Sequence, residues 1–107
     1  MSNELFDNIR QWGQNRGLDH ADSKVQCDEK LFEEYQELRA AIYAKDKTEI
    51  IDAIGDCVVV LTMIAMQERL KIEDCIACAY DTIKNRKGKL VNGVFVKDEP
   101  PSQHNPV

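Results

Sequence analysis

Three carboxylates precede an apolar run near the middle of the chain: Glu49, Asp52 and Asp56. The run, residues 57–66, is apolar apart from one threonine, and its length favours a buried helix over a strand or a membrane span. On such a helix the three acids lie within roughly 60° of one another, in the sector that continues into the apolar side chains. Carboxylates that run into a core face repel one another and lose solvation, so the pattern predicts a divalent cation as their counter-charge.

A second acidic group lies upstream, in a helix predicted over residues 24–44. It consists of Glu33, Glu34 and Glu37, interleaved with an apolar stripe at helical spacing, namely Leu31, Tyr35, Leu38 and Ile42. Glu34 lies on the edge of this stripe, whereas Glu33 faces away from it. A solvated acidic face explains Glu33 well, and it explains Glu34 less well because that carboxylate borders the predicted core.

The connection between these two helices is short, since only residues 45–48 form a polar break. A connection of this length makes the two helices antiparallel neighbours. Counted from the turn, Glu34 and Glu37 then lie at heights similar to that of Asp56, and Asp52 lies about one turn nearer the loop. The sequence therefore predicts that two acidic pairs on facing helices converge on one site.

The other elements are also expected to be mostly helical. We predict an all-α, four-helix bundle-like fold followed by a small hairpin around Asn92-Gly93. The expected helices cover residues 3–15, 24–44, 49–66 and 72–87, and the hairpin covers residues 90–96. Residues 97–107 carry all three prolines and are predicted to form a flexible tail.

Composition narrows the classes of function. The formal net charge is -5, and this acidic balance argues against a nucleic-acid or anionic-membrane surface. No segment reaches transmembrane length and the N-terminus lacks the apolar core of a signal peptide, so we expect a cytoplasmic protein. The chain has four cysteines, of which Cys75 and Cys78 have the spacing of a redox or zinc pair. Because they fall in a predicted helix without a partner pair, we expect all four to be buried or half-buried free thiols.

Two further features are candidates for ligand contacts. Trp12, in the first predicted helix, is expected to be a core or interface anchor, with base stacking as the minority option. The segment Asn85-Arg86-Lys87-Gly88-Lys89 closes the fourth predicted helix with three cations. Cations followed by glycine are ordinary helix-capping chemistry, and they are also what a triphosphate needs beside an acidic metal site. Spacing alone favours neither interpretation.

The two acidic segments together resemble a known family. Glu33-Glu34-Tyr35-Gln36-Glu37-Leu38, followed by Asp52-Ala53-Ile54-Gly55-Asp56 at the start of a long apolar helix, is similar to the MazG-like all-α nucleoside triphosphate pyrophosphohydrolases. That superfamily also holds the dimeric dUTPases, the dCTP pyrophosphatases and phosphoribosyl-ATP pyrophosphohydrolase. The C-terminal segments look like those of its small, phage-type members. The resemblance covers about residues 5–96 and implies one helical domain over residues 1–96.

The resemblance implies a set of metal ligands. The family pattern is Glu-x-x-Glu on one helix and Glu-x-x-Asp on the next. Glu34 and Glu37 match the first pair and Asp56 matches the last position, but Ala53 stands where the family has its second-helix Glu. Asp52 is the natural substitute, on the same face as Asp56. We therefore expect the ligands Glu34, Glu37, Asp52 and Asp56, with Glu49 as second choice.

The resemblance also implies an activity, the hydrolysis of a nucleoside triphosphate to the monophosphate and pyrophosphate. It implies Mg²⁺ as cofactor, with Mn²⁺ as an alternative, and either Glu34 or Glu37 as the group that orients or deprotonates water. The expected substrate-binding residues are Trp12, Asn85, Arg86, Lys87 and Lys89. A homodimer or homotetramer is expected, and the apolar circumference of the third helix agrees with this.

Three alternatives stay open. The enzyme could have a narrow specificity for dCTP or dUTP. It could act on phosphoribosyl-ATP, which we rank lower because Gly55-Asp56 and the Asn85–Lys89 ending look more like the MazG side. From a different class, the chain could be a helical interaction or regulatory module in which the acids are simply solvated.

Overall fold

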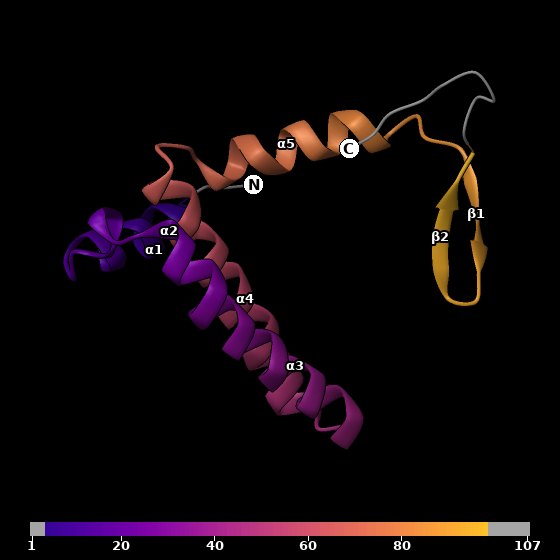
Figure 1. Ribbon diagram of the computed structural model, residues 1–107, viewed down its shortest axis with the longest axis horizontal. Coiled ribbons are helices and arrows are strands. Elements are labelled where there is room, and N and C mark those ends of the chain that lie inside the picture. The colour runs from indigo at the N-terminus through magenta and orange to yellow at the C-terminus, as the bar shows by residue number, and fades with distance from the viewer. Residues whose placement is uncertain (1–3, 99–107) are drawn as a thin grey trace. The chain divides into compact units, whose positions relative to one another are not determined.

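The computed structural model describes residues 4–98, and these residues are predominantly helical (Figure 1). This confirms the predicted all-α class with a small C-terminal hairpin. In chain order the elements are α1 (Glu4–Gln14), a 3-10 turn (Leu18–His20), α2 (Ser23–Val25), a π-helical segment (Gln26–Leu31), α3 (Phe32–Ala44), α4 (Lys47–Gln67), α5 (Ile72–Ile83), β1 (Gly88–Val91) and β2 (Val94–Lys97).

The second predicted helix is present but is not a regular α-helix throughout. The residues at both ends of the π-helical segment keep right-handed helical dihedrals, so α2, this segment and α3 form one continuous helix. Asp22 caps its start by accepting a hydrogen bond from the backbone N–H of Lys24 at 2.9 Å. The prediction of residues 24–44 was therefore correct to within a residue at its start, whereas the π-helical segment was not predicted.

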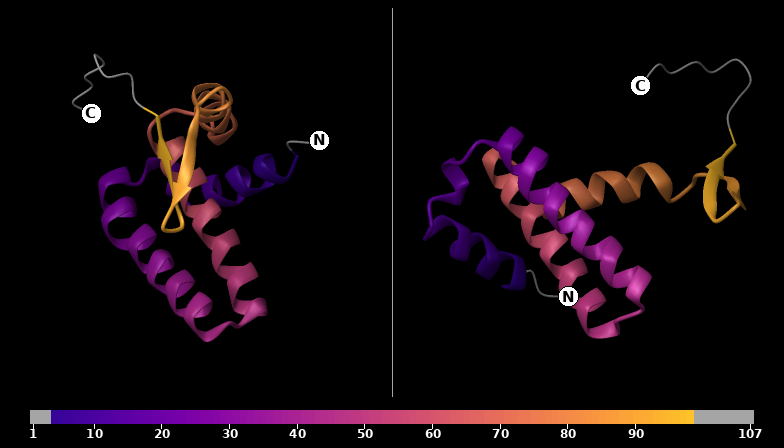
Figure 2. Two further views of the ribbon diagram at one scale, coloured as in Figure 1. Left: turned by 90° about the vertical axis from the view of Figure 1, so that its right-hand side faces the viewer. Right: turned by 60° about the horizontal axis from the view of Figure 1, so that its bottom comes forward.

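Helices α3 and α4 form the antiparallel hairpin that the short connection predicts (Figure 2). Lys45 ends α3 in the left-handed region, with a φ of 55°. Asp46 then begins α4 by accepting a hydrogen bond from the backbone N–H of Glu49 at 3.2 Å. These two residues turn the chain back, so that residues equally distant from the turn lie at similar heights along the hairpin.

The core lies along α4. Its buried side chains are Ala53, Val60, Thr62, Met63, Ala65 and Met66. Helix α1 crosses α4 at Gly13, where an added Cβ would lie 2.9 Å from the Cε atom of Met63. Glycine at this crossing therefore lets α1 pack directly on the methionines of α4.

The apolar stripe predicted for α3 is wrong in part. Tyr35 and Ile42 are 54% and 52% exposed, whereas Glu34 and Ala41 are buried. The face of α3 that packs on α4 is thus centred on Glu34, and the predicted core face lies to one side of it. The spacing of apolar residues along one helix does not determine which of its faces packs on a neighbouring helix.

The chain divides into two compact units, with the division after Cys75. The second unit holds most of α5 and the hairpin, whose strands pair antiparallel from Gly88 opposite Lys97 to Val91 opposite Val94. Asn92 and Gly93 have φ values of 52° and 82°, as a two-residue type I′ turn requires. The predicted hairpin is confirmed and is slightly longer than expected.

The predicted C-terminal boundaries differ in detail. Helix α5 ends at Ile83, four residues before its predicted end, so Asn85, Arg86 and Lys87 lie in the connection to β1. Lys97, where the flexible tail was predicted to begin, is the last residue of β2. The rest of that tail, from residue 99 on, lies outside the described residues. That residues 1–96 act as one domain stays a prediction.

Within residues 4–98, no helix is long and apolar enough to cross a membrane. All four cysteines are free, as predicted. Their burial was predicted less well, because Cys27, Cys75 and Cys78 are exposed and only Cys57 is half-buried. Cys75 and Cys78 lie on α5, none of whose residues is buried.

Candidate active site

Three of the predicted metal ligands meet on the α3–α4 hairpin. Glu34 and Glu37 project from successive turns of α3, and Asp56 projects from the facing part of α4. One carboxylate oxygen from each of the three lies within 4.8 Å of the others. We call Glu34, Glu37 and Asp56 the acidic cluster. Carboxylate oxygens gathered in this way are the donor set that Mg²⁺ and Mn²⁺ prefer.

Glu34 is the buried member of the acidic cluster. The residue is 5% exposed, and its Oε1 atom is buried without a hydrogen-bond partner among the described residues. Its Oε2 atom lies 3.2 Å from the ammonium nitrogen of Lys30, and this contact raises the pKa of Lys30. A buried carboxylate oxygen that lacks a partner is costly, and a cation beside Oε1 would offset that cost.

The cluster has an excess of negative charge. Burial raises the pKa of Asp56, and the neighbouring Asp52 and Glu34 carboxylates raise it further. The Glu34 carboxylate is also the main cause of the raised pKa of Glu37, which is exposed to solvent. Repulsion and lost solvation thus act on Asp56, as the sequence predicts, and also on Glu37 of the facing helix.

Asp52 and Glu49 lie outside the acidic cluster. Asp52 is exposed, one turn before Asp56 on α4, and it acts on the cluster through its charge. Glu49 is exposed near the start of α4 and lines a shallow cavity that also includes Glu37. The choice between these two residues as a fourth ligand stays a prediction.

An apolar pocket adjoins the acidic cluster. It has a volume of about 390 Å³ and is lined by Asn8, Ile9 and Trp12 of α1 and by Asp56 and Val59 of α4. We call it the α1 pocket. Asp56 belongs both to this pocket and to the acidic cluster, so the two sites are continuous. A pocket of this size with few polar groups is typical of a small-molecule site.

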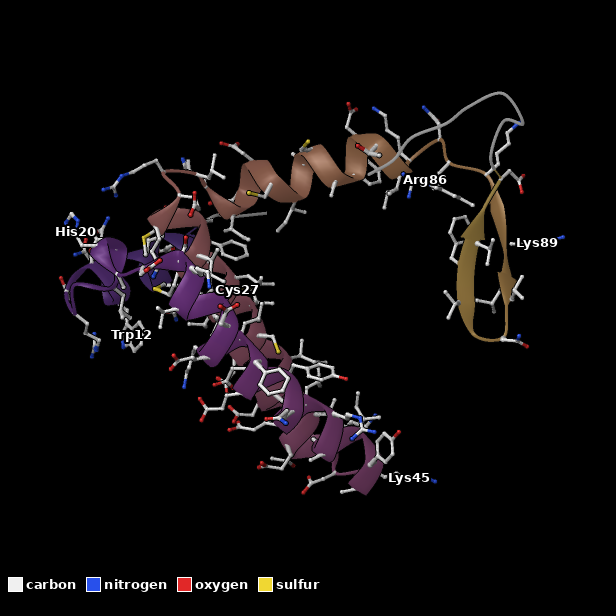
Figure 3. The ribbon with its side chains drawn as sticks, viewed as in Figure 1. Trp12, His20, Cys27, Lys45, Arg86 and Lys89 are labelled. Carbon is white, nitrogen blue, oxygen red and sulfur yellow. The ribbon has the colours of Figure 1, made fainter. Side chains whose placement is uncertain are left out.

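Trp12, which is labelled in Figure 3, lies on α1. It is the aromatic residue that lines the α1 pocket, and it is 45% exposed. The guanidinium of Arg16 lies over the indole ring at 4.4 Å from its centroid and donates a hydrogen bond to the Trp12 carbonyl at 2.9 Å. Arg16 thereby holds one face of the ring. Trp12 is thus not a core residue, and its roles as an interface anchor or in base stacking stay predictions.

Helix α1 is fixed in place by an ion pair. Arg10 donates hydrogen bonds to both carboxylate oxygens of Glu73, at 2.6 and 2.7 Å, and also contacts Asp7 at 2.5 Å. The bond from Arg10 lowers the pKa of Glu73 to about 2. Both side chains of the long-range pair are largely buried, so it positions the helix that carries one wall of the pocket.

The predicted phosphate contacts lie in the second unit. Asn85, Arg86 and Lys87 follow α5, and Lys89 is on β1, where its side chain points away from the hairpin (Figure 3). A role for these four residues in binding phosphate beside the acidic cluster stays a prediction.

Two residues at the site were missed by sequence reasoning. Lys30 was missed although it stands four residues before Glu34, a spacing that places both on one helix face. Asn8 was missed because nothing in the sequence indicates that α1 closes a pocket with α4. Lys30 could have been found from its spacing to Glu34, whereas the position of Asn8 depends on tertiary packing.

Comparison with known proteins gives two matches. A family model described as phosphoribosyl-ATP pyrophosphohydrolase matches residues 13–82. The chain is also 38% identical over 68 residues to an uncharacterized 18.2 kDa protein, from the rep-hol intergenic region of Haemophilus phage HP1 (strain HP1c1). That alignment covers 63% of this chain and 41% of the phage protein, so the chain matches less than half of its relative's length. No solved structure matches the chain.

Proposed function

Because the chain belongs to the phosphoribosyl-ATP pyrophosphohydrolase family, we propose that it hydrolyses a nucleoside triphosphate to the monophosphate and pyrophosphate. The observation that carries this proposal is the buried Glu34 carboxylate, whose Oε1 atom has no partner within the described chain, beside Glu37 and Asp56. A solvated acidic face, as in a regulatory helical module, has no reason to bury one of its carboxylates.

The residues present fit a divalent metal ion. Glu34, Glu37 and Asp56 would hold it, with Asp52 or Glu49 as the further acid. A bound Mg²⁺ or Mn²⁺ offsets the charge of the polyphosphate oxygens. The donor set is entirely carboxylate oxygen, which agrees with a hard cation and not with a thiolate-ligated metal.

Glu37 is the better candidate for the proton acceptor. It is exposed to water, and the Glu34 carboxylate raises its pKa toward the range in which a base accepts a proton effectively. Water attacks the α-phosphorus and forms a new P–O bond, while the bond from that phosphorus to the bridging oxygen breaks. Pyrophosphate leaves with that oxygen, and the water proton passes to the carboxylate.

The α1 pocket receives the nucleoside in this proposal. Trp12 and Val59 offer apolar surface to the base, and Asp56 joins the pocket to the acids that face the phosphates. Base–aromatic stacking suits any base, so the pocket supports a nucleotide without selecting one. The cations Arg86, Lys87 and Lys89 stay candidates for the phosphate tail.

A second candidate substrate is phosphoribosyl-ATP. It is favoured by the description of the matching family model. The same cleavage between the α- and β-phosphates would apply, and the same acids would be used. The sequence alone ranks it lower, so the two substrates need a direct comparison.

The test is pyrophosphate release from a panel of nucleoside triphosphates and phosphoribosyl-ATP, with Mg²⁺ and with a chelator. Glu34→Gln should lower the rate by about 100-fold or more. Glu33→Gln is the matched control, because Glu33 neighbours Glu34 and is contacted by the same lysine, yet its side chain is 56% exposed. No release from any substrate, or full activity in Glu34→Gln, would contradict the proposal.

A further inference from the structure

Lys30 is the cation nearest the buried acid of the site. Its Nζ atom lies 3.2 Å from Glu34 Oε2 and 3.3 Å from Glu33 Oε1. The Lys30 side chain is 49% exposed, whereas that of Glu34 is 6% exposed. The ammonium group therefore sits at the solvent-facing edge of the acidic cluster and neutralises one oxygen of its least solvated member.

One lysine does not balance this group of carboxylates. Glu34 Oε1 keeps no partner within residues 4–98, and Glu37, Asp56 and Asp52 add negative charge around it. A divalent cation held by the acidic cluster would share Glu34 with the ammonium of Lys30. Two cations on one carboxylate repel each other. The Lys30 ammonium can move away at a lower cost in free energy than the metal ion, because its side chain is flexible and half-exposed.

The place of Lys30 in the chain agrees with such a movement. It is the last residue but one of the π-helical segment, Gln26–Leu31, and precedes α3. Irregular turns of this kind are frequent beside functional sites. Its side chain is in contact with solvent, so leaving Glu34 requires no repacking of the core.

We propose that Lys30 is a displaceable counter-ion of Glu34, which a divalent cation replaces and which then contacts the polyphosphate of the substrate. The first half concerns metal binding alone. The second half rests on the proposed function, because it needs an anionic substrate beside the acidic cluster. An ammonium released from Glu34 lies close enough to the cluster to serve a phosphate oxygen there.

The first test measures the binding of Mg²⁺, and of Mn²⁺ as a second probe, to the full chain by titration calorimetry without nucleotide. Lys30→Met should bind either ion roughly three- to tenfold more tightly than the wild type, because the competing cation is gone. Lys24→Met is the matched control. Lys24 forms the same i, i+4 pair with Asp28, at 3.1 Å, but both side chains are exposed and lie outside the site.

Equal or weaker metal binding by Lys30→Met, or no metal binding by the wild type, would overturn the displacement. Lys30→Gln gives the same comparison if the methionine variant folds poorly. The second test is steady-state hydrolysis at saturating Mg²⁺, where Lys30→Met should raise KM about tenfold and change kcat little, and Lys30→Arg should restore KM. An unchanged KM would overturn the contact with phosphate.

These outcomes separate the inference from the proposed function. Hydrolysis by the wild type, together with unchanged metal affinity in Lys30→Met, would remove the inference and leave the function. If Lys30→Met binds the metal more tightly but the wild type hydrolyses no substrate of the panel, the displacement of Lys30 is kept and the proposed function is lost.

Discussion

At the scale of one residue, Glu34 carries a buried charge that opposes stability. Folding removes its carboxylate from water and leaves Oε1 without a partner in the described chain, beside two further acids. Such an arrangement raises the free energy of the folded state relative to one with neutral side chains. We therefore expect the acidic cluster to lower the free energy of unfolding when no cation offsets its charge.

Asp56→Asn tests this expectation. In the presence of a chelator the variant should have a Tm higher than that of the wild type by about 2–5 °C, because a repelled and partly buried charge is removed. The rise produced by adding Mg²⁺ to the wild type should be lost. Thermal unfolding followed by circular dichroism measures both effects, and Asp28→Asn, on an exposed acid, is the control.

The effect of Asp56→Asn on Tm is expected to depend on pH. Since the pKa of Asp56 is raised from 3.8, the folded protein binds more protons than the unfolded chain from that value up to the raised pKa. The contribution of Asp56 to stability therefore falls as pH rises through this interval and is constant above it. The gap in Tm between Asp56→Asn and the wild type should widen over the same interval. A gap independent of pH would contradict this.

Trp12→Ala should raise KM for the nucleotide about tenfold, because stacking on a base contributes about 1–3 kcal/mol. Tyr43→Ala is the control, since Tyr43 also has an arginine over its ring, Arg39 at 4.7 Å, but lies on α3 outside the α1 pocket. Steady-state kinetics on the best substrate of the panel provide the measurement. Equal effects of the two substitutions would exclude a specific role for the pocket.

At the scale of elements, the Arg10–Glu73 pair connects α1 to the first turn of α5. Arg10 lowers the pKa of Glu73 to about 2, from an ordinary value of 4.5. The folded state therefore holds fewer protons there, and the stabilisation is complete above pH 4.5 and lost as pH falls toward 2. Glu73→Gln should lower Tm at pH 7, and the difference from the wild type should shrink over that interval.

Asp74→Asn separates this ion pair from a general effect of acids at the start of a helix. Asp74 follows Glu73 in the first turn of α5 but is exposed. Both substitutions remove a negative charge near the helix N-terminus, which contributes a few tenths of a kcal/mol in either case. If Asp74→Asn lowers Tm as much as Glu73→Gln does, Arg10 has no special part in holding α1.

The sequence predicts those elements and site residues whose signals are local. The Asn92-Gly93 turn and the Asp46 cap follow from residue chemistry alone, and the meeting of Glu34 with Asp56 follows from helix spacing and a short connection. The exposure of Tyr35 does not follow, because the spacing of apolar residues in α3 does not determine which face of that helix packs on α4. Asn8 in the α1 pocket has the same tertiary origin.

At the scale of the whole molecule, part of the apolar surface of α4 is exposed within the first unit. Along α4, the exposed residues Ile51, Ile54 and Leu61 and the half-buried Val58 recur at spacings of three and four. This is the pattern of a seam between helices. It supports our expectation of a homodimer or homotetramer, since such a seam is self-complementary in two copies.

Ile54→Glu should therefore shift the protein toward the monomer in sedimentation velocity, because a charge in the seam opposes an interface of about 800 Å² per partner. Leu5→Glu is the control, as Leu5 is 69% exposed on α1 and outside the seam. A wild type that sediments as a monomer at all concentrations would refute the expectation.

The crossing of α1 over α4 at Gly13 coincides with the start of the segment that the family model matches. The family model matches from residue 13 onward, so the acidic cluster belongs to the shared part of the chain, while Asn8, Ile9 and Trp12 precede it. Under the proposed function, the α1 wall that faces the base therefore lies outside the segment that the family model matches, and the acids proposed to cleave the nucleotide lie inside it.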